Sequence, residues 1–201
     1  IEAEIKAFAP EAHLFTGGDF EVYISKLGTE SAIMRELSRL REITFRSVGE
    51  GTGLEKDTDV YDAQYLHLFI WNAKAKEIVG AYRLGLADEI CKKFGPSGLY
   101  THTLFKFDES LTEKILPGIE LGRSFVRPEY QKAFQPLLYL WKGIGMFISR
   151  NPQYVNLFGP VSITADYKDT SRNMLLRSLE LSNFANDLAH LVKPRNKPAR
   201  M

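Results

Sequence analysis

Apolar residues recur along the chain with the periods of both strands and helices. Residues 20–27 alternate apolar and polar side chains, as a half-buried strand does, whereas residues 30–47 carry apolar side chains at helical spacing. Thr29 or Ser31 is suited to cap that helix, because a hydroxyl oxygen can accept from the free N–H groups of a first turn. Further strands are expected at residues 65–72, 77–86, 99–105, 119–126 and 155–163, and further helices at 87–94, 133–149, 170–181 and 186–192.

The order of these elements predicts a mixed sheet flanked by helices, which belongs to the α/β or α+β class. Residues 73–76 join two apolar runs, as the loop of a hairpin does. The 201 residues suit one domain. We expect a lead-in or linker at 1–19, the domain at 20–192 and a basic tail at 193–201. Because the first residue is Ile1 rather than Met, the chain is expected to be part of a longer protein.

Composition and charge exclude several classes of protein. The 44% of hydrophobic and 25% of charged residues are values of a globular domain, not of a disordered or fibrous chain. The net charge of +1 gives no reason to expect a nucleic-acid partner. No apolar run approaches the roughly 18 residues that a membrane span needs. The four histidines are scattered, so no metal site is expected, and the single Cys91 indicates a reducing compartment.

An acidic loop is the first candidate site. Asp57, Asp59 and Asp62 lie within six positions, without the glycine and terminal glutamate of a calcium loop. Such a loop can bind a cationic group, such as an amine substrate or an arginine of a partner. A solvated turn explains the same residues equally well.

Charges inside a predicted strand are the second candidate. Glu120 and Arg123 flank Gly122 in the strand at 119–126, and Arg83 lies within the strand at 77–86. Burying a charge is costly unless it is paired, so these residues indicate either a site or a buried ion pair. The turn at 127–132 that follows carries cations before a helix and is a weak candidate for an anion site.

Four segments in this order resemble one known family: LREITF at 40–45, the acidic loop ending at Asp62, IVGAYRL at 78–84 and ELGRSFV at 120–126. The chain resembles the acyltransferase branch of the GNAT superfamily, which includes the ornithine- and glycine-lipid N-acyltransferases. Acyl-homoserine-lactone synthases are more distant. Residues 158–163 and 191–195 resemble bacterial proteins labelled hemolysins, many of which carry this module after a lysophospholipid-acyltransferase domain.

The resemblance implies a mixed, mostly antiparallel sheet that splays between the parallel strands at 119–126 and 155–163. The pantetheine arm of a fatty acyl thioester would lie in the splay. Residues 131–136 read QKAFQP in place of the usual pyrophosphate loop, which favours acyl carrier protein over CoA as donor, with no tightly bound cofactor. The residues expected to bind this donor are Phe125, Val126, Arg127, Tyr130 and Lys132.

The resemblance further implies direct acylation of an amine. Glu120 is the expected base or ammonium ligand, and Arg123, like Arg83, is expected either to bind a carboxylate of the acceptor or to hold the acidic residues in place. Backbone N–H groups near Phe125 would polarise the thioester carbonyl. The residues expected to bind the acceptor are Arg41, Asp59, Asp62 and Arg83. An acyl tunnel is expected among Phe105, Phe107, Phe125, Phe134, Tyr139 and Trp141, although these residues also suit an ordinary core.

Two other functions stay open at this point. A non-catalytic module that binds acyl carrier protein or lipid would share the fold. A membrane-lytic protein is the least favoured, because no cationic amphipathic helix is evident. The expected partners are acyl carrier protein, a small amine or amino acid and a peripheral membrane contact, without nucleic acid. The expected location is the cytoplasm, at the inner face of the membrane where such a contact forms.

Overall fold

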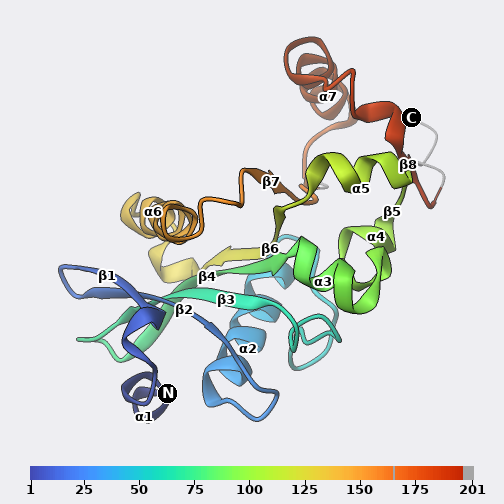
Figure 1. Cartoon of the computed structure of the whole chain (residues 1–201). Coiled ribbons are helices and arrows are strands. Elements are labelled where there is room, and N and C mark those ends of the chain that lie inside the picture. Colours follow the sequence, from blue (N-terminus) through green and yellow to red (C-terminus); the bar gives the residue numbers. More distant parts are fainter. Residues whose placement is uncertain (165, 197–201) are drawn as a thin grey trace.

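The computed structural model describes residues 1–164 and 166–196 and contains a six-stranded and a two-stranded sheet (Figure 1). The large sheet has the order β1-β2-β3-β4-β6-β7, and all its strand pairs are antiparallel except β6–β7. The predicted mixed, mostly antiparallel sheet is therefore confirmed. Its strands are β1 (His13–Gly17), β2 (Phe20–Lys26), β3 (Leu66–Asn72), β4 (Glu77–Leu86), β6 (Gly118–Val126) and β7 (Asn156–Phe158).

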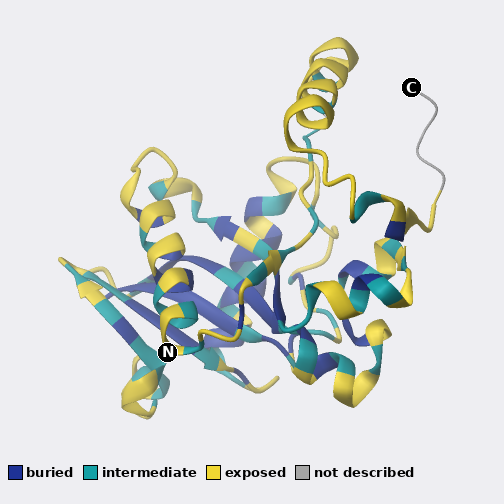
Figure 2. Ribbon diagram, turned by 45° about the horizontal axis from the view of Figure 1, so that its top comes forward, coloured by how far each residue is buried: buried dark blue, intermediate teal, exposed yellow. Residues whose placement is uncertain are grey.

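Helices cover both faces of the large sheet. In β3, Leu68 and Ile70 pack toward α6 (Gln135–Arg150), whereas Phe69 and Trp71 pack toward α2 (Ala32–Arg46). This double burial explains why β3 is a continuous apolar run (Figure 2). The other α-helices in the described residues are α1 (Glu2–Lys6), α3 (Ala87–Phe94), α4 (Thr101–Leu104), α5 (Glu109–Ile115) and α7 (Asp169–Asn183).

The N–H groups in the first turn of helix α2 have side-chain hydrogen-bond acceptors. The Ser31 hydroxyl accepts from the Met34 N–H at 3.1 Å, which identifies Ser31 rather than Thr29 as the cap. The Glu4 carboxylate of α1 accepts from the N–H groups of Ala32 at 2.6 Å and Ile33 at 3.1 Å. The N-terminal segment is thereby tied to the domain through a carboxylate at the positive end of a helix.

Several short elements differ from the sequence predictions. The strand expected at 99–105 is wrong, because residues Thr101–Leu104 form α4 and β5 (Phe105–Phe107) begins only afterwards. The strand expected at 155–163 shortens to β7. Residues 1–19 are more than a lead-in, since they contain α1 and the edge strand β1, which pairs with β2 through an irregular register. Such short, irregular elements carry too few residues for a clear period.

The C-terminal part is less tightly packed than the sheet. The basic tail expected at 193–201 begins inside β8 (Val192–Pro194), which pairs with β5, and residues 197–201 lie outside the described part. Helix α7 has no buried residue and projects away from the sheet (Figure 2). Among the helices that the structure describes, none is both long and apolar enough to cross a membrane.

Candidate active site

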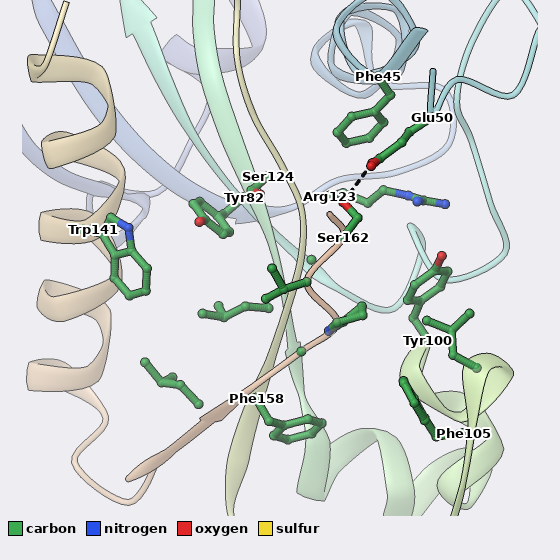
Figure 3. Close-up of a pocket in the computed structure, with 17 residues that line it drawn as sticks. Phe45, Glu50, Tyr82, Tyr100, Phe105, Arg123, Ser124, Trp141, Phe158 and Ser162 are labelled. Carbon is green, nitrogen blue, oxygen red and sulfur yellow. Dashed lines mark hydrogen bonds between the residues drawn. The ribbon is translucent and has the colours of Figure 1, made fainter. Parts of the chain in front are cut away.

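The large sheet opens between β6 and β7. Register pairs join the two strands only from Gly118↔Asn156 to Glu120↔Phe158, although β6 continues to Val126. A cavity of about 810 Å³ occupies the resulting splay (Figure 3). The rest of β6 therefore has an edge that β7 does not pair, beside a space large enough for a ligand.

The splay cavity reaches both faces of the sheet. Figure 3 shows Trp141 and Tyr82 on the α6 side of β6, and Phe45, Glu50 and Tyr100 on the other side. The α6 side is apolar and is completed by Leu121 and Leu157, whereas polar groups gather on the α2 side. The polar groups there are Glu50, Tyr100, Arg123 and Ser162.

A second cavity of about 680 Å³ adjoins the first one. It lies between the end of α2, the second half of β6 and the apolar face of α7 that carries Leu175 and Leu179. The residues that line both cavities are Phe45, Glu50, Ser124, Val161 and Ser162. These shared residues mark a junction where a long ligand can pass from one cavity into the other.

A β-bulge in β6 lies at this junction. The register of β4 and β6 shifts between Ala81↔Phe125 and Arg83↔Gly122, so that Arg123 and Ser124 stand opposite one residue of β4. Arg123 has φ +48°, a left-handed conformation that is uncommon for residues other than glycine. The bulge thus takes backbone groups out of regular pairing beside the cavity.

Arginines and aspartates form a buried network behind the bulge. Arg41 makes a bidentate pair with Asp62, with nitrogen–oxygen distances of 2.8 and 2.9 Å. Arg83 Nη1 lies 2.6 Å from Asp59 and 2.9 Å from Asp62. Burial alone would raise the pKa of Asp62. The hydrogen bonds and charge of Arg41 and the charge of Arg83 outweigh that effect and hold this pKa well below its ordinary value.

The third arginine connects this network to the bulge. Arg123 Nε lies 3.3 Å from Asp57 and its Nη2 lies 3.3 Å from Asp59, while the guanidinium stacks over the ring of Tyr100. Burial raises the pKa of Asp57, against the charges of Arg123 and Arg41. Asp57, Asp59 and Asp62 are thus matched by three arginines, so Arg83 and Arg123, two of the three charges predicted inside strands, belong to an ion-pair network.

Glu120 lies apart from the cavities and is 1% exposed. Its carboxylate accepts from the hydroxyl of Tyr65 and from the N–H groups of Tyr100 at 3.0 Å and Thr101 at 2.6 Å. These donors occupy its oxygens and fix the start of α4, whose N-cap residue Tyr100 lines the splay cavity. The geometry therefore favours a positioning role for Glu120 over contact with a substrate.

The expected donor residues divide into two groups. Phe125 and Val126 line the second cavity, as does Gln131, which the sequence prediction did not include. Arg127 and Tyr130 instead bind Glu77, at 2.7 and 2.6 Å, outside the lining of either cavity. Lys132 is exposed in the turn between them and α6. The N–H groups of Arg127, Tyr130 and Gln131 already donate to backbone carbonyls, so they are not free for a phosphate.

The aromatic residues expected in an acyl tunnel are also split. Trp141 and Phe105 line the splay cavity, and Phe125 lines the second one. Tyr139 packs in the core against Phe15 and Phe20. Phe107 packs in the small core cluster near α3, and Phe134 is 74% exposed. An aromatic residue near the site in sequence is therefore a weak guide to the cavity wall.

His67 packs against the network and gives the fold a pH dependence. Its Nε2 donates to the carbonyl oxygen of Asp62 at 3.0 Å, and burial lowers its pKa to about 4. Because an unfolded histidine titrates near about pH 6.5, the unfolded state binds more protons between that pH and the folded pKa, and stability falls as pH falls through this window.

We expect the free energy of unfolding, measured with urea, to drop by about 2 kcal/mol between about pH 7 and 5. In a His67→Gln variant, whose amide keeps a donor for Asp62, the drop should largely disappear. An equal drop in both proteins would place the proton uptake elsewhere.

Known proteins resemble this chain over most of its length. A family model described as "Acetyltransferase (GNAT) domain" matches residues 40–142, about half of the chain, including the network, the bulge and part of α6. A protein of Bacteroides thetaiotaomicron named glycine N(alpha)-acyltransferase is 38% identical over 187 residues, covering 87% of this chain and 54% of the relative. A protein of Phocaeicola vulgatus with the same name is 38% identical over 185 residues, with 87% and 56% covered. The chain thus spans about half the length of these relatives.

Proposed function

Because this chain belongs to the acetyltransferase (GNAT) domain family, we propose that it transfers a long fatty acyl group from a thioester directly to the amine of an amino acid or amino-lipid. The observation that carries the proposal is the cavity through the β6–β7 splay, apolar on one face of the sheet and polar on the other. A single ligand at the bulge can then present its apolar tail to one side and its reactive carbonyl to the other.

The donor enters along the unpaired edge of β6. Its pantetheine arm lies in the second cavity, where Phe125, Val126 and Gln131 face residues 161–164. Amide groups of such an arm can pair with strand backbone that has no partner, as an added strand does. The acyl chain continues through the junction into the apolar half of the splay cavity, against Tyr82, Leu121 and Trp141.

The thioester carbonyl lies at the bulge formed by Arg123 and Ser124. A backbone N–H released from ladder pairing there would stabilise the oxyanion of the tetrahedral intermediate. The ion-pair network holds Arg123 in its left-handed conformation. In this proposal Arg41, Asp59, Asp62 and Arg83 act by fixing the bulge, and Glu120 acts by fixing Tyr100 beside it.

Acyl carrier protein is the donor carrier that we propose. Residues 131–136 read QKAFQP and contain no glycine for a turn suited to a pyrophosphate. The exposed Lys132 beside the second cavity is suited to attract an acidic carrier. The curated relatives are named for acylation of glycine, which makes glycine the first acceptor to test. The proposal includes a location in the cytoplasm with a peripheral membrane contact. Leu137 and Leu138 of α6 are half exposed and are suited to make such a contact.

The direct experiment is a transfer assay with the purified chain. Palmitoyl-acyl carrier protein and palmitoyl-CoA are offered with glycine, ornithine or no acceptor, and free thiol and acylated amine are measured. We expect thiol release that depends on the acceptor and is faster from the carrier protein. Tight donor binding without turnover would instead support a binding module.

A further inference from the structure

Glu50 is the only acidic residue among the described residues that line the two cavities, and it lies at their junction. Each of the other candidate carboxylates is already occupied. Asp59 and Asp62 are paired with arginines, and Glu120 accepts from three protein donors away from the cavities. A carboxylate that faces the reacting group must therefore be sought in the loop after α2 rather than in the strands.

The loop holds Glu50 in a defined place. The N–H of Glu50 donates to the carbonyl of Phe45 at 2.8 Å, and Gly49 has φ +76°. This is the usual C-terminal cap of an α-helix, in which a glycine in the left-handed conformation ends the helix. The buried Glu42 carboxylate then anchors the following residues, accepting from the N–H groups of Thr52 at 2.9 Å and Gly53 at 3.0 Å. The backbone of Glu50 is thus fixed on both sides.

The side chain of Glu50, by contrast, keeps free capacity to accept. Its one hydrogen bond in the described structure comes from the hydroxyl of Ser162, at 3.0 Å (Figure 3). A carboxylate has about four acceptor positions, so most of them remain open to a ligand. The side chain is exposed, while Ser124 of the bulge lines the same two cavities. Carboxylate and proposed oxyanion site therefore meet at one junction.

We propose that Glu50 binds the ammonium group of the acceptor and takes up one of its protons. This inference rests on the acyl-transfer function proposed above. The amine nitrogen then forms a bond with the thioester carbonyl carbon, and the carbon–sulfur bond breaks as the tetrahedral intermediate collapses. The second proton of the nitrogen goes to the leaving thiolate, which gives an amide and a thiol. Because Glu50 is exposed, it returns its proton to water.

The test compares Glu50→Gln with wild type in acceptor-dependent thiol release from the palmitoyl thioester, with glycine as acceptor. A positioned base contributes about 10²–10⁴-fold, so we expect kcat/KM for glycine to fall at least about 100-fold. Glu50→Asp should recover part of that loss. Glu55→Gln, which removes a carboxylate from the same exposed loop outside both cavities, should retain the wild-type rate.

Two further measurements distinguish proton uptake by Glu50 from a purely structural role of its hydrogen bond with Ser162. Hydroxylamine is neutral at the assay pH and needs no deprotonation, so the defect of Glu50→Gln should shrink markedly with it. Ser162→Ala removes the hydrogen bond but keeps the carboxylate, and it should lose far less than Glu50→Gln. Equal losses in these two variants, or an equal defect with both acceptors, would overturn the proposal. If the wild type transfers no acyl group to any amine, the proposed function fails as well, whereas an active Glu50→Gln variant refutes only the role of Glu50.

Discussion

Replacing Asp62 with alanine is expected to lower the free energy of unfolding by about 3–5 kcal/mol. Asp62 is 5% exposed and pairs with both Arg41 and Arg83, each 2% exposed. Removing the shared carboxylate leaves Arg41 and Arg83 close together with less negative charge to compensate them. Breaking a buried pair costs far more than forming it gains, because the partner charge cannot return to water.

Urea unfolding at neutral pH measures this loss, and an exposed ion pair is the control. Arg177 and Glu180 form a pair on α7 with side chains 69% and 57% exposed, so Glu180→Ala should change stability by less than about 1 kcal/mol. The double variant Asp62→Ala, Arg83→Ala should lose less than the sum of the single losses, since one uncompensated charge is removed. A loss below about 1 kcal/mol for Asp62→Ala would indicate that water reaches the network.

The loss of stability that protonation of this network causes occurs at a lower pH than the loss caused by His67. Since the arginines hold the pKa of Asp62 below its unfolded value, its contribution is present above that unfolded value, about 4, and is lost only as pH falls further. The loss between about pH 7 and 5 belongs instead to His67, whose folded pKa is about 4. Asp62→Ala should therefore lower the free energy of unfolding at every pH between about 5 and 7 while leaving its change over that range as it is in the wild type.

Charge inside a strand was the informative signal in the sequence. Arg83 and Glu120 occur where an apolar residue would ordinarily be buried, so their need for partners could be predicted. Their partners could not be predicted, because Asp59 lies in a loop and Tyr65 lies just before β3, a strand that β4 separates from the β6 strand of Glu120. The structure places the four residues predicted to bind the acceptor, Arg41, Asp59, Asp62 and Arg83, behind the cavity rather than in its wall.

Glu50 and Ser162 are residues whose place at the site could not be predicted from the sequence. Glu50 lies in an irregular loop, and Ser162 lies in the part of the expected strand at 155–163 that the structure leaves irregular; the two residues meet across 112 positions of sequence. Only the tertiary structure brings them to the bulge. The short elements β1, α4 and β8 were missed for a related reason, since three to five residues do not establish a period of 2 or 3.6.

Replacing Gly122 with leucine is expected to lower kcat/KM for the donor at least about 100-fold while leaving the fold intact, because displacing a reacting group by about 1 Å can cost that much. Gly122 lines the splay cavity, and a Cβ added there would have no heavy atom within 4 Å. The side chain can therefore enter open space without a clash. It would occupy the place that we assign to the thioester end of the acyl chain.

Gly28→Leu is the matched control, since a Cβ at Gly28 also meets nothing within 4 Å and Gly28 lines neither cavity. Both variants should unfold near the wild-type temperature, and only Gly122→Leu should lose thiol release and donor binding. A smaller side chain refines the assignment: if the apolar half beyond Gly122 holds the acyl chain, Gly122→Ala should disfavour long chains more than short ones. Equal losses for all chain lengths would place the acyl chain outside the splay, whereas full activity of Gly122→Leu would remove the splay from the donor path altogether.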